Sequence, residues 1–149
     1  MPRKAKEDIA AIYRKAAQEH ITLAIELHEA GRYVMAHYIA GLSVECILRA
    51  FRYRIDPVFD SRHNLEMLYA DAHFDDRIPL ERRAEVGTAL TEVVRRWNNN
   101  HRYRSEQALQ NYLRQAGLGR TGKFVRESSR RIVNAAITIA EQGDIHWND

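Results

Sequence analysis

One long apolar stretch, residues 32–54, constrains the fold of this chain more than any other feature. A helix on the surface of a globular protein shows one apolar stripe, whereas this stretch is apolar on nearly every side. That pattern is typical of a central helix that several other helices contact. Its longest apolar run, residues 34–48, is short for a membrane span and contains His37 and Glu45. We therefore expect the central helix of a bundle and no association with a membrane.

The segments on either side of this stretch also have apolar residues at helical spacing, and none has the alternation of a strand. A first helix is expected over residues 9–27, with Gly31 as its C-terminal stop. A shorter helix is expected over residues 63–72, with Ser61 as its N-cap. Residues 71–76 then form an acidic connection.

The C-terminal half continues the helical pattern. Pro79 suits the first turn of a helix whose apolar stripe ends near Trp97. Ser105 is placed to cap a further helix that Gly117 ends, and a last helix is expected over residues 124–142, before Gly143. The connections are short, so the expected fold is all-α, a single five- to six-helix up-and-down bundle.

Length and composition agree with one globular domain over residues 1–149. The charged N-terminus lacks the apolar stretch of a signal peptide, and Cys46, the single cysteine, cannot form a disulfide within the chain. These features predict a cytoplasmic protein. The histidines show no ligand spacing typical of a metal site, so we expect neither a metal nor another cofactor.

The chemistry of the sequence is concentrated in residues 95–104. This basic segment contains four arginines, one histidine, one tyrosine and three asparagines, with no acidic residue, and we expect it in an exposed loop. Arg96 can hold a phosphate through two hydrogen bonds, while His101 can give or take a proton. Because RNA brings its own nucleophile, the 2′-hydroxyl, such a pair can cleave RNA without a metal, most credibly as two copies in a homodimer. The alternative is a solvated helix end whose arginines pair with nearby carboxylates.

Several segments in the expected order resemble those of the HEPN domain family of small helical bundles. Residues 36–50 are similar to the second-helix pattern of that family, in which small residues and a glutamate precede an aliphatic-basic-alanine ending. His63-Asn64-Leu65, followed by Leu68, resembles the His-x-Leu-x-x-Leu stretch that opens the third helix. The arrangement of Arg96, His101 and Tyr103, with four residues and then one residue between them, follows in the expected place.

The resemblance implies a function and a set of partners. Active HEPN proteins are metal-independent ribonucleases that work as dimers, and many are toxins paired with a nucleotidyltransferase antitoxin that adenylylates a tyrosine. By matched position, Arg96 and His101 would be catalytic and Tyr103 would be the modification site. Glu45 would support the site, and the residues expected to bind the RNA or nucleotide substrate are Arg95, Asn98, Arg102 and Arg104.

One departure from the family pattern supports a different function. The residue after the motif arginine is usually polar, whereas here it is Trp97, so Arg95 is an alternative motif arginine. HEPN-like proteins without ribonuclease activity often keep an Arg-Tyr pair here, and Arg102-Tyr103 matches that pair. The alternative function is therefore a non-catalytic module that binds RNA, a nucleotide or a nucleotidyltransferase partner. Glu45 would then be paired with Arg102, or in a structural ion pair with His63 or another arginine.

Residues 117–123 match the G-x-x-x-x-G-K pattern of a phosphate-binding loop, but Phe124 replaces the Ser or Thr that such a loop needs at magnesium. A helix rather than a strand precedes the loop, so we interpret it as a glycine-rich connection between helices. The basic residues beside it form either a surface for nucleic acid or a solvated helix face: Lys123, Arg126, Arg130 and Arg131.

Overall fold

The computed structural model describes residues 2–58, 62–120 and 122–149. In these ranges the chain forms seven α-helices and one 3-10 helix and no strand, which confirms the all-α bundle with slightly more helices than expected. The elements are α1 (Pro2–Glu29), α2 (Tyr33–Ile55), α3 (Leu65–Asp71), α4 (Phe74–Arg77), α5 (Leu80–Arg96), η1 (Asn99–Tyr103), α6 (Glu106–Gln115) and α7 (Phe124–Ile145).

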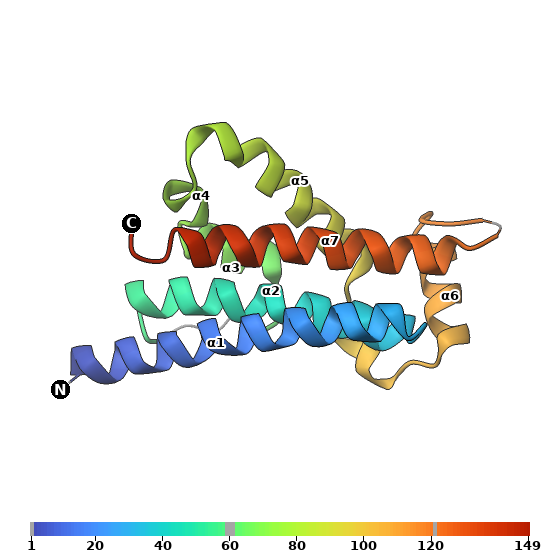
Figure 1. Cartoon of the computed structure of the whole chain (residues 1–149), viewed down its shortest axis with the longest axis horizontal. Coiled ribbons are helices and arrows are strands. Elements are labelled where there is room, and N and C mark those ends of the chain that lie inside the picture. The colour runs from blue at the N-terminus through green and yellow to red at the C-terminus, as the bar shows by residue number, and fades with distance from the viewer. Residues whose placement is uncertain (1, 59–61, 121) are drawn as a thin grey trace.

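Three long helices, α1, α2 and α7, lie side by side and form the body of the bundle (Figure 1). Helix α1 runs antiparallel to the other two, and α5 crosses α7 at an angle on the side away from α1. Most residues of α2 are buried between these neighbours, as its apolar composition predicts. By length and hydropathy alone α2 could also cross a membrane, but most of this helix is buried inside the bundle.

Local signals in the sequence account for several of the helix ends. Gly31 and Gly117 adopt φ angles of +75° and +74° just after α1 and α6, where a residue without Cβ is favoured. The Ser105 hydroxyl accepts the Ala108 amide at 3.1 Å and so caps α6 as predicted. Helix α3 is capped by Asn64, whose side chain accepts the Met67 amide at 3.0 Å, while the predicted cap Ser61 lies outside the described residues.

The prediction that the last helix ends before Gly143 is wrong. Helix α7 continues through Gly143 to Ile145, and this glycine is buried against α2. A Cβ added at Gly143 would lie 2.6 Å from Cγ1 of Ile47, so a side chain there would push the two helices apart. The glycine therefore permits close helix packing, a tertiary role that looks identical to a stop signal in the sequence.

The acidic connection expected at residues 71–76 contains a short helix, α4. Its first residue, Phe74, is fully buried and packs edge-on against Phe51 of α2, with ring centroids 5.1 Å apart. Asp75 accepts a hydrogen bond from the Tyr69 hydroxyl at 2.5 Å, and Asp76 stays exposed. The buried aromatic ring thus holds this acidic segment in a helical turn against the bundle.

Candidate functional site

The basic segment, residues 95–104, is not the open loop that the sequence predicted. Arg96 is the last residue of α5, Trp97 is its C-cap, and η1 follows at once. His101 is fully buried and Arg96 is 4% exposed, whereas Arg102 and Tyr103 face solvent. The segment therefore divides into a buried half and an exposed half.

His101 uses both ring nitrogens inside the protein. Nε2–H donates to the backbone carbonyl of Arg96 at 2.8 Å, and Nδ1 accepts from Nη1 of Arg104 at 2.9 Å. The ring also packs edge-on against Tyr112, with centroids 4.8 Å apart. Burial, together with the positive charge of Arg104, lowers the pKa of His101 to about 4, although the bond to the Arg96 carbonyl acts in the opposite direction. His101 is thus a neutral residue of the interior.

Arg96 anchors a chain of buried hydrogen bonds. Its Nε donates to Oε2 of Glu92 at 2.9 Å, and its Nη1 donates to Oγ of Ser128 on α7 at 3.2 Å. The Ser128 hydroxyl in turn lies 2.8 Å from Nε2 of His37, whose Nδ1–H donates to the Tyr33 carbonyl at 2.7 Å. The chain joins α5, α7 and α2, so Arg96 has a structural role whatever else it does.

His37 is a member of this arrangement that reasoning from sequence did not place there. Its ring is fully buried and lies edge-on to His101, with centroids 6.0 Å apart. Burial lowers the pKa of His37 to about 3, despite the bond to the Tyr33 carbonyl. The available signal was a histidine within an otherwise apolar helix, because a buried polar side chain must find partners.

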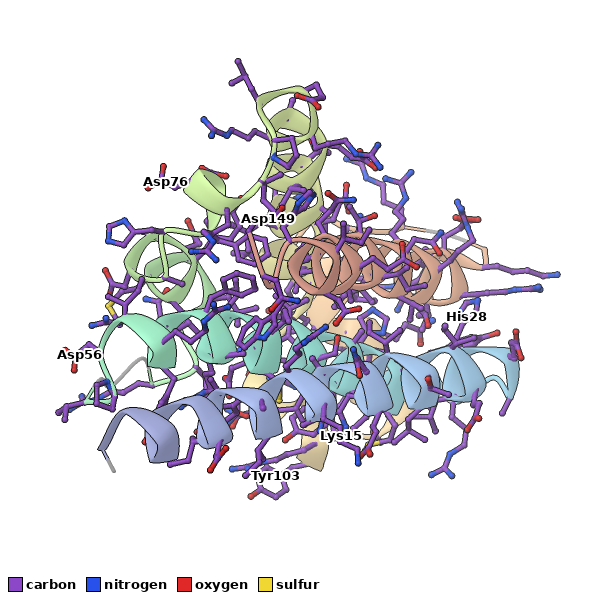
Figure 2. The ribbon with its side chains drawn as sticks, turned by 60° about the vertical axis from the view of Figure 1, so that its left-hand side comes forward. Lys15, His28, Asp56, Asp76, Tyr103 and Asp149 are labelled. Atoms are coloured by element: carbon purple, nitrogen blue, oxygen red, sulfur yellow. The ribbon has the colours of Figure 1, made fainter. Side chains whose placement is uncertain are left out.

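The other predicted site residues lie apart from this interior cluster. The Asn98 side chain accepts the Asn100 amide at 2.8 Å and starts η1. The Arg102 guanidinium stacks 4.6 Å from the centre of the Tyr103 ring, and Tyr103 is 76% exposed. Figure 2 shows Tyr103 at the edge of the molecule, pointing away from the bundle. Arg104 is half-buried and covers the Tyr112 ring at 4.7 Å in addition to binding His101.

Glu45 lies on α2, and its hydrogen-bond partners are residues other than Arg102. Its Oε1 accepts from Nδ1 of His63 at 2.6 Å, and its Oε2 accepts from Nε of Arg49 at 3.2 Å. In the described part of the chain, no hydrogen bond or ion pair joins Glu45 to Arg102. Of the alternatives that the sequence left open, the geometry matches the pairing with His63 and an arginine.

A pocket of about 270 Å³ lies where the end of α5 meets the first turns of α7. Of the predicted site residues, Arg95 and Arg96 line it. Arg131 of α7 adds a third guanidinium, and Glu127 is the acidic residue in the lining. The first amides of a helix have no acceptor within it and carry the positive end of its dipole, so an anion is favoured at this end of α7. The remaining lining residues are Gly117, Leu118, Phe124 and Ser128.

Within the described residues, no group of three or more His, Cys, Asp or Glu side chains is arranged to hold a metal ion. The thiol of Cys46 is buried, and burial together with the neighbouring Glu45 raises its pKa to about 11, so it is a poor nucleophile. The chemistry that the described residues around this pocket offer is anion binding by arginines.

Comparisons with protein-family models, with curated proteins and with solved structures found no match to this chain. The resemblance to the HEPN family therefore stays a prediction that rests on the ordered motifs, and the site is interpreted from its geometry.

Proposed function

We propose that this chain is a HEPN-like module that binds the phosphate groups of RNA at the pocket between α5 and α7. The observation that supports this most is the convergence of Arg95, Arg96 and Arg131 around one pocket at the N-terminal end of a long helix. A guanidinium offers two parallel N–H donors to a phosphate, and a helix N-terminus adds amide donors and a favourable dipole. A phosphodiester is the anion that this combination suits.

The surroundings of the pocket favour a polymer over an isolated anion. Residues 120–131 contain five basic side chains and one acidic side chain, Glu127. Four of the basic ones, besides the pocket residue Arg131, are exposed along the loop and the first turns of α7: Arg120, Lys123, Arg126 and Arg130. Glu127 is bound to Arg130 at 2.6 Å, which partly neutralises it. Successive phosphates of one RNA strand could therefore bind in the pocket and along this surface.

The environment of His101 supports binding without catalysis. A general base needs a lone pair that can reach the proton it removes, and the Nδ1 lone pair of His101 is already bound by Arg104. Its ring is fully buried and does not line the pocket. Arg96 is likewise held by Glu92 and Ser128, and Nη1 of Arg131 lies 3.8 Å from Oε1 of the same Glu92. The exposed Arg95 is therefore the pocket arginine most available to a phosphate.

The test is fluorescence anisotropy with a labelled single-stranded RNA of mixed sequence, measured at several salt concentrations. Removing one phosphate contact by Arg95→Ala or Arg131→Ala should weaken binding about tenfold, or ~1.4 kcal/mol, and reduce the salt dependence by about one ion. The matched control is Arg82→Ala, which removes a half-exposed arginine of α5 that pairs with Glu85 and does not line the pocket. Absence of RNA binding, or an equal loss in the control, contradicts the proposal.

The second candidate is the metal-independent ribonuclease, in which Arg96 and His101 act at the cleft of a homodimer. One observation favours it: the structure brings the two motif residues into contact through the His101–Arg96 carbonyl hydrogen bond at 2.8 Å. Catalysis would require His101 to exchange its present partners for the substrate. Under this hypothesis the exposed Tyr103 is available to a nucleotidyltransferase antitoxin.

An RNA cleavage assay in EDTA separates the two candidates. Purified protein is incubated with total RNA and defined tRNAs beside the His101→Ala variant, with folding of both proteins checked by circular dichroism. Cleavage by the wild type alone, leaving 2′,3′-cyclic phosphate ends, supports the ribonuclease. RNA that is bound but intact supports the binding module.

A further inference from the structure

The proposed RNA-binding function does not use the pair formed by Glu45 and His63. Glu45 is 4% exposed, whereas the side chain of His63, just before α3, is 43% exposed. Because Glu45 accepts from Nδ1 of His63 at 2.6 Å, the neutral ring carries its proton on Nδ1 and its lone pair on Nε2. Among the described residues, nothing forms a hydrogen bond with that Nε2 atom. A buried carboxylate thus orients an exposed imidazole with one nitrogen free, which is the arrangement of a general base.

The backbone that holds His63 is strained. Arg62 and His63 have φ angles of +45° and +65°, a region that residues with a side chain seldom occupy. Such conformations persist when the surroundings impose them, and they are frequent at functional sites. Here the strained turn lies directly before the Asn64 cap of α3 and places the imidazole over Glu45.

His63 borders a pocket of about 150 Å³ whose other lining residues are Asn64, Leu65, Glu66, Val94 and Trp97. The Trp97 indole is a fixed wall, because its Nε1–H donates to the Tyr38 carbonyl at 3.1 Å and its ring packs on Gly41. The lining contains no lysine or arginine and does contain the Glu66 carboxylate, so it disfavours anions such as phosphate. Its apolar walls favour a small uncharged ligand.

Asn64 adds a hydrogen-bond donor to this pocket. Its side-chain oxygen is occupied by the Met67 amide, which orients the amide group and leaves the NH₂ as the available donor. A donor beside a base can stabilise the negative charge that develops on a carbonyl oxygen during attack by water. His63 and Asn64 both line this pocket, so they can supply it with the base and the donor that hydrolysis of an acyl compound needs.

We propose that Glu45, His63 and Asn64 form a hydrolytic site for small uncharged esters, with His63 as the catalytic base and Glu45 as a positioning residue. Nε2 of His63 takes a proton from a water molecule while the water oxygen bonds to the ester carbonyl carbon. The bond from that carbon to the leaving oxygen then breaks, and the leaving group takes the proton from Nε2. The products are the carboxylic acid and the alcohol, and the imidazole returns to its starting state.

The first test is hydrolysis of p-nitrophenyl acetate by the wild type and by His63→Asn, since asparagine tolerates a positive φ. The matched control is His73→Asn. His73 also has a positive φ, +52°, and an exposed side chain, but its nearest carboxylate, Asp76, is exposed and 3.8 Å away. We expect His63→Asn to lower the rate constant at least tenfold and His73→Asn to leave it within twofold. A wild type no faster than buffer, or an equal loss in both variants, overturns the proposal.

The second test is ¹⁵N NMR of the histidine rings, which reports which ring nitrogen carries the proton. The wild type should show His63 as the Nδ1–H form, and finding Nε2–H would overturn the proposal even if no variant folds. In folded Glu45→Gln this preference should weaken and the rate constant for the ester should fall several-fold. A changed tautomer with an unchanged rate would assign Glu45 a structural role only and contradict its positioning role.

Discussion

The two ends of α2 are held in place by different forces. Near its N-terminal end, His37 belongs to the hydrogen-bonded chain that runs through Ser128 to Arg96, beside the buried His101. We call these four residues the polar cluster. Near its C-terminal end, Phe51 packs edge-on against Phe74 and Trp147, with centroids 5.1 Å apart in both cases. We call these three the aromatic cluster.

The two clusters differ in what each contact requires. Aromatic contacts depend on shape and buried area and are insensitive to protonation. The polar cluster depends on directed hydrogen bonds, in which each donor needs its acceptor and each histidine must be neutral. The polar cluster also adjoins the proposed phosphate pocket through Arg96 and Ser128. The end of the bundle that is more demanding to assemble is therefore the end that positions the candidate site.

The largest predicted difference between the clusters is their response to acid. Folded His37 and His101 have pKa values near 3 and 4, well below the ordinary 6.5, so the unfolded chain binds more protons. The free energy of unfolding therefore has its full value above about pH 6.5. It falls as the pH drops from there toward the pKa values of the two folded histidines, by up to ~1.4 kcal/mol per pH unit for each histidine. Urea unfolding at a series of pH values measures this slope.

A folded His101→Gln variant should reduce the slope by about one proton. Phe74→Ala should lower stability at every pH and leave the slope unchanged. Equal slopes in wild type and His101→Gln would mean that His101 has the same pKa in the folded and the unfolded chain. The comparison of the two clusters would then fail.

Removing one ring tests the aromatic cluster. Phe74 is fully buried, so Phe74→Ala should lower the free energy of unfolding by about 3–5 kcal/mol through lost transfer energy and a cavity. The measurement is urea unfolding at pH 7, with Leu80→Ala, a change at a 75% exposed residue, as the control expected within about 0.5 kcal/mol of the wild type. A loss below 1 kcal/mol for Phe74→Ala would show that α4 is not anchored by this ring.

A smaller loss of stability than for Phe74→Ala is expected from a substitution where α2 meets the end of α5. A Cβ at Gly41 would lie 2.0 Å from Cδ1 of Trp97, so Gly41→Ala must displace the indole and should cost about 1–3 kcal/mol. The same change should disturb the pocket beside His63, which Trp97 also lines. Thermal unfolding and tryptophan fluorescence measure the two consequences.

The matched control for Gly41→Ala is Gly87→Ala, for which we expect the smallest change in stability. Gly87 lies within α5 with no atom within 4 Å of an added Cβ, so Gly87→Ala should raise stability by about 0.5–1 kcal/mol through its higher helix propensity. If both glycine variants were stabilised alike, the close packing of Gly41 on Trp97 would be contradicted.

Much of the secondary structure was accessible from sequence, because the signals that set it are local. The periodic apolar residues predicted the long helices, and Ser105, Gly31 and Gly117 marked ends that the structure confirms. The sequence features that misled were those whose structure is decided by tertiary contacts rather than by their neighbours in the chain. Gly143 has the appearance of a stop but accommodates Ile47, and the acidic connection hides Phe74, whose burial produces α4.

For the candidate site, sequence identified some of the residues but not their exposure, and it did not place His37 there. It singled out Arg96 and His101 as reactive, although both are buried, and it gave His63 only as part of a helix-opening motif and as a partner for Glu45. Exposure and free lone pairs depend on which helices pack on a segment, and no local pattern encodes that packing.

By itself, the sequence determined that this chain is an all-α bundle around one apolar helix, because helical periodicity and composition suffice for that conclusion. Tertiary structure alone decided which arginines surround a pocket, which histidines are buried in the neutral form, and that His63 lies over Glu45. The physical reason is that periodicity is a property of neighbours along the chain, whereas desolvation and hydrogen-bond partners are set by residues far apart in it.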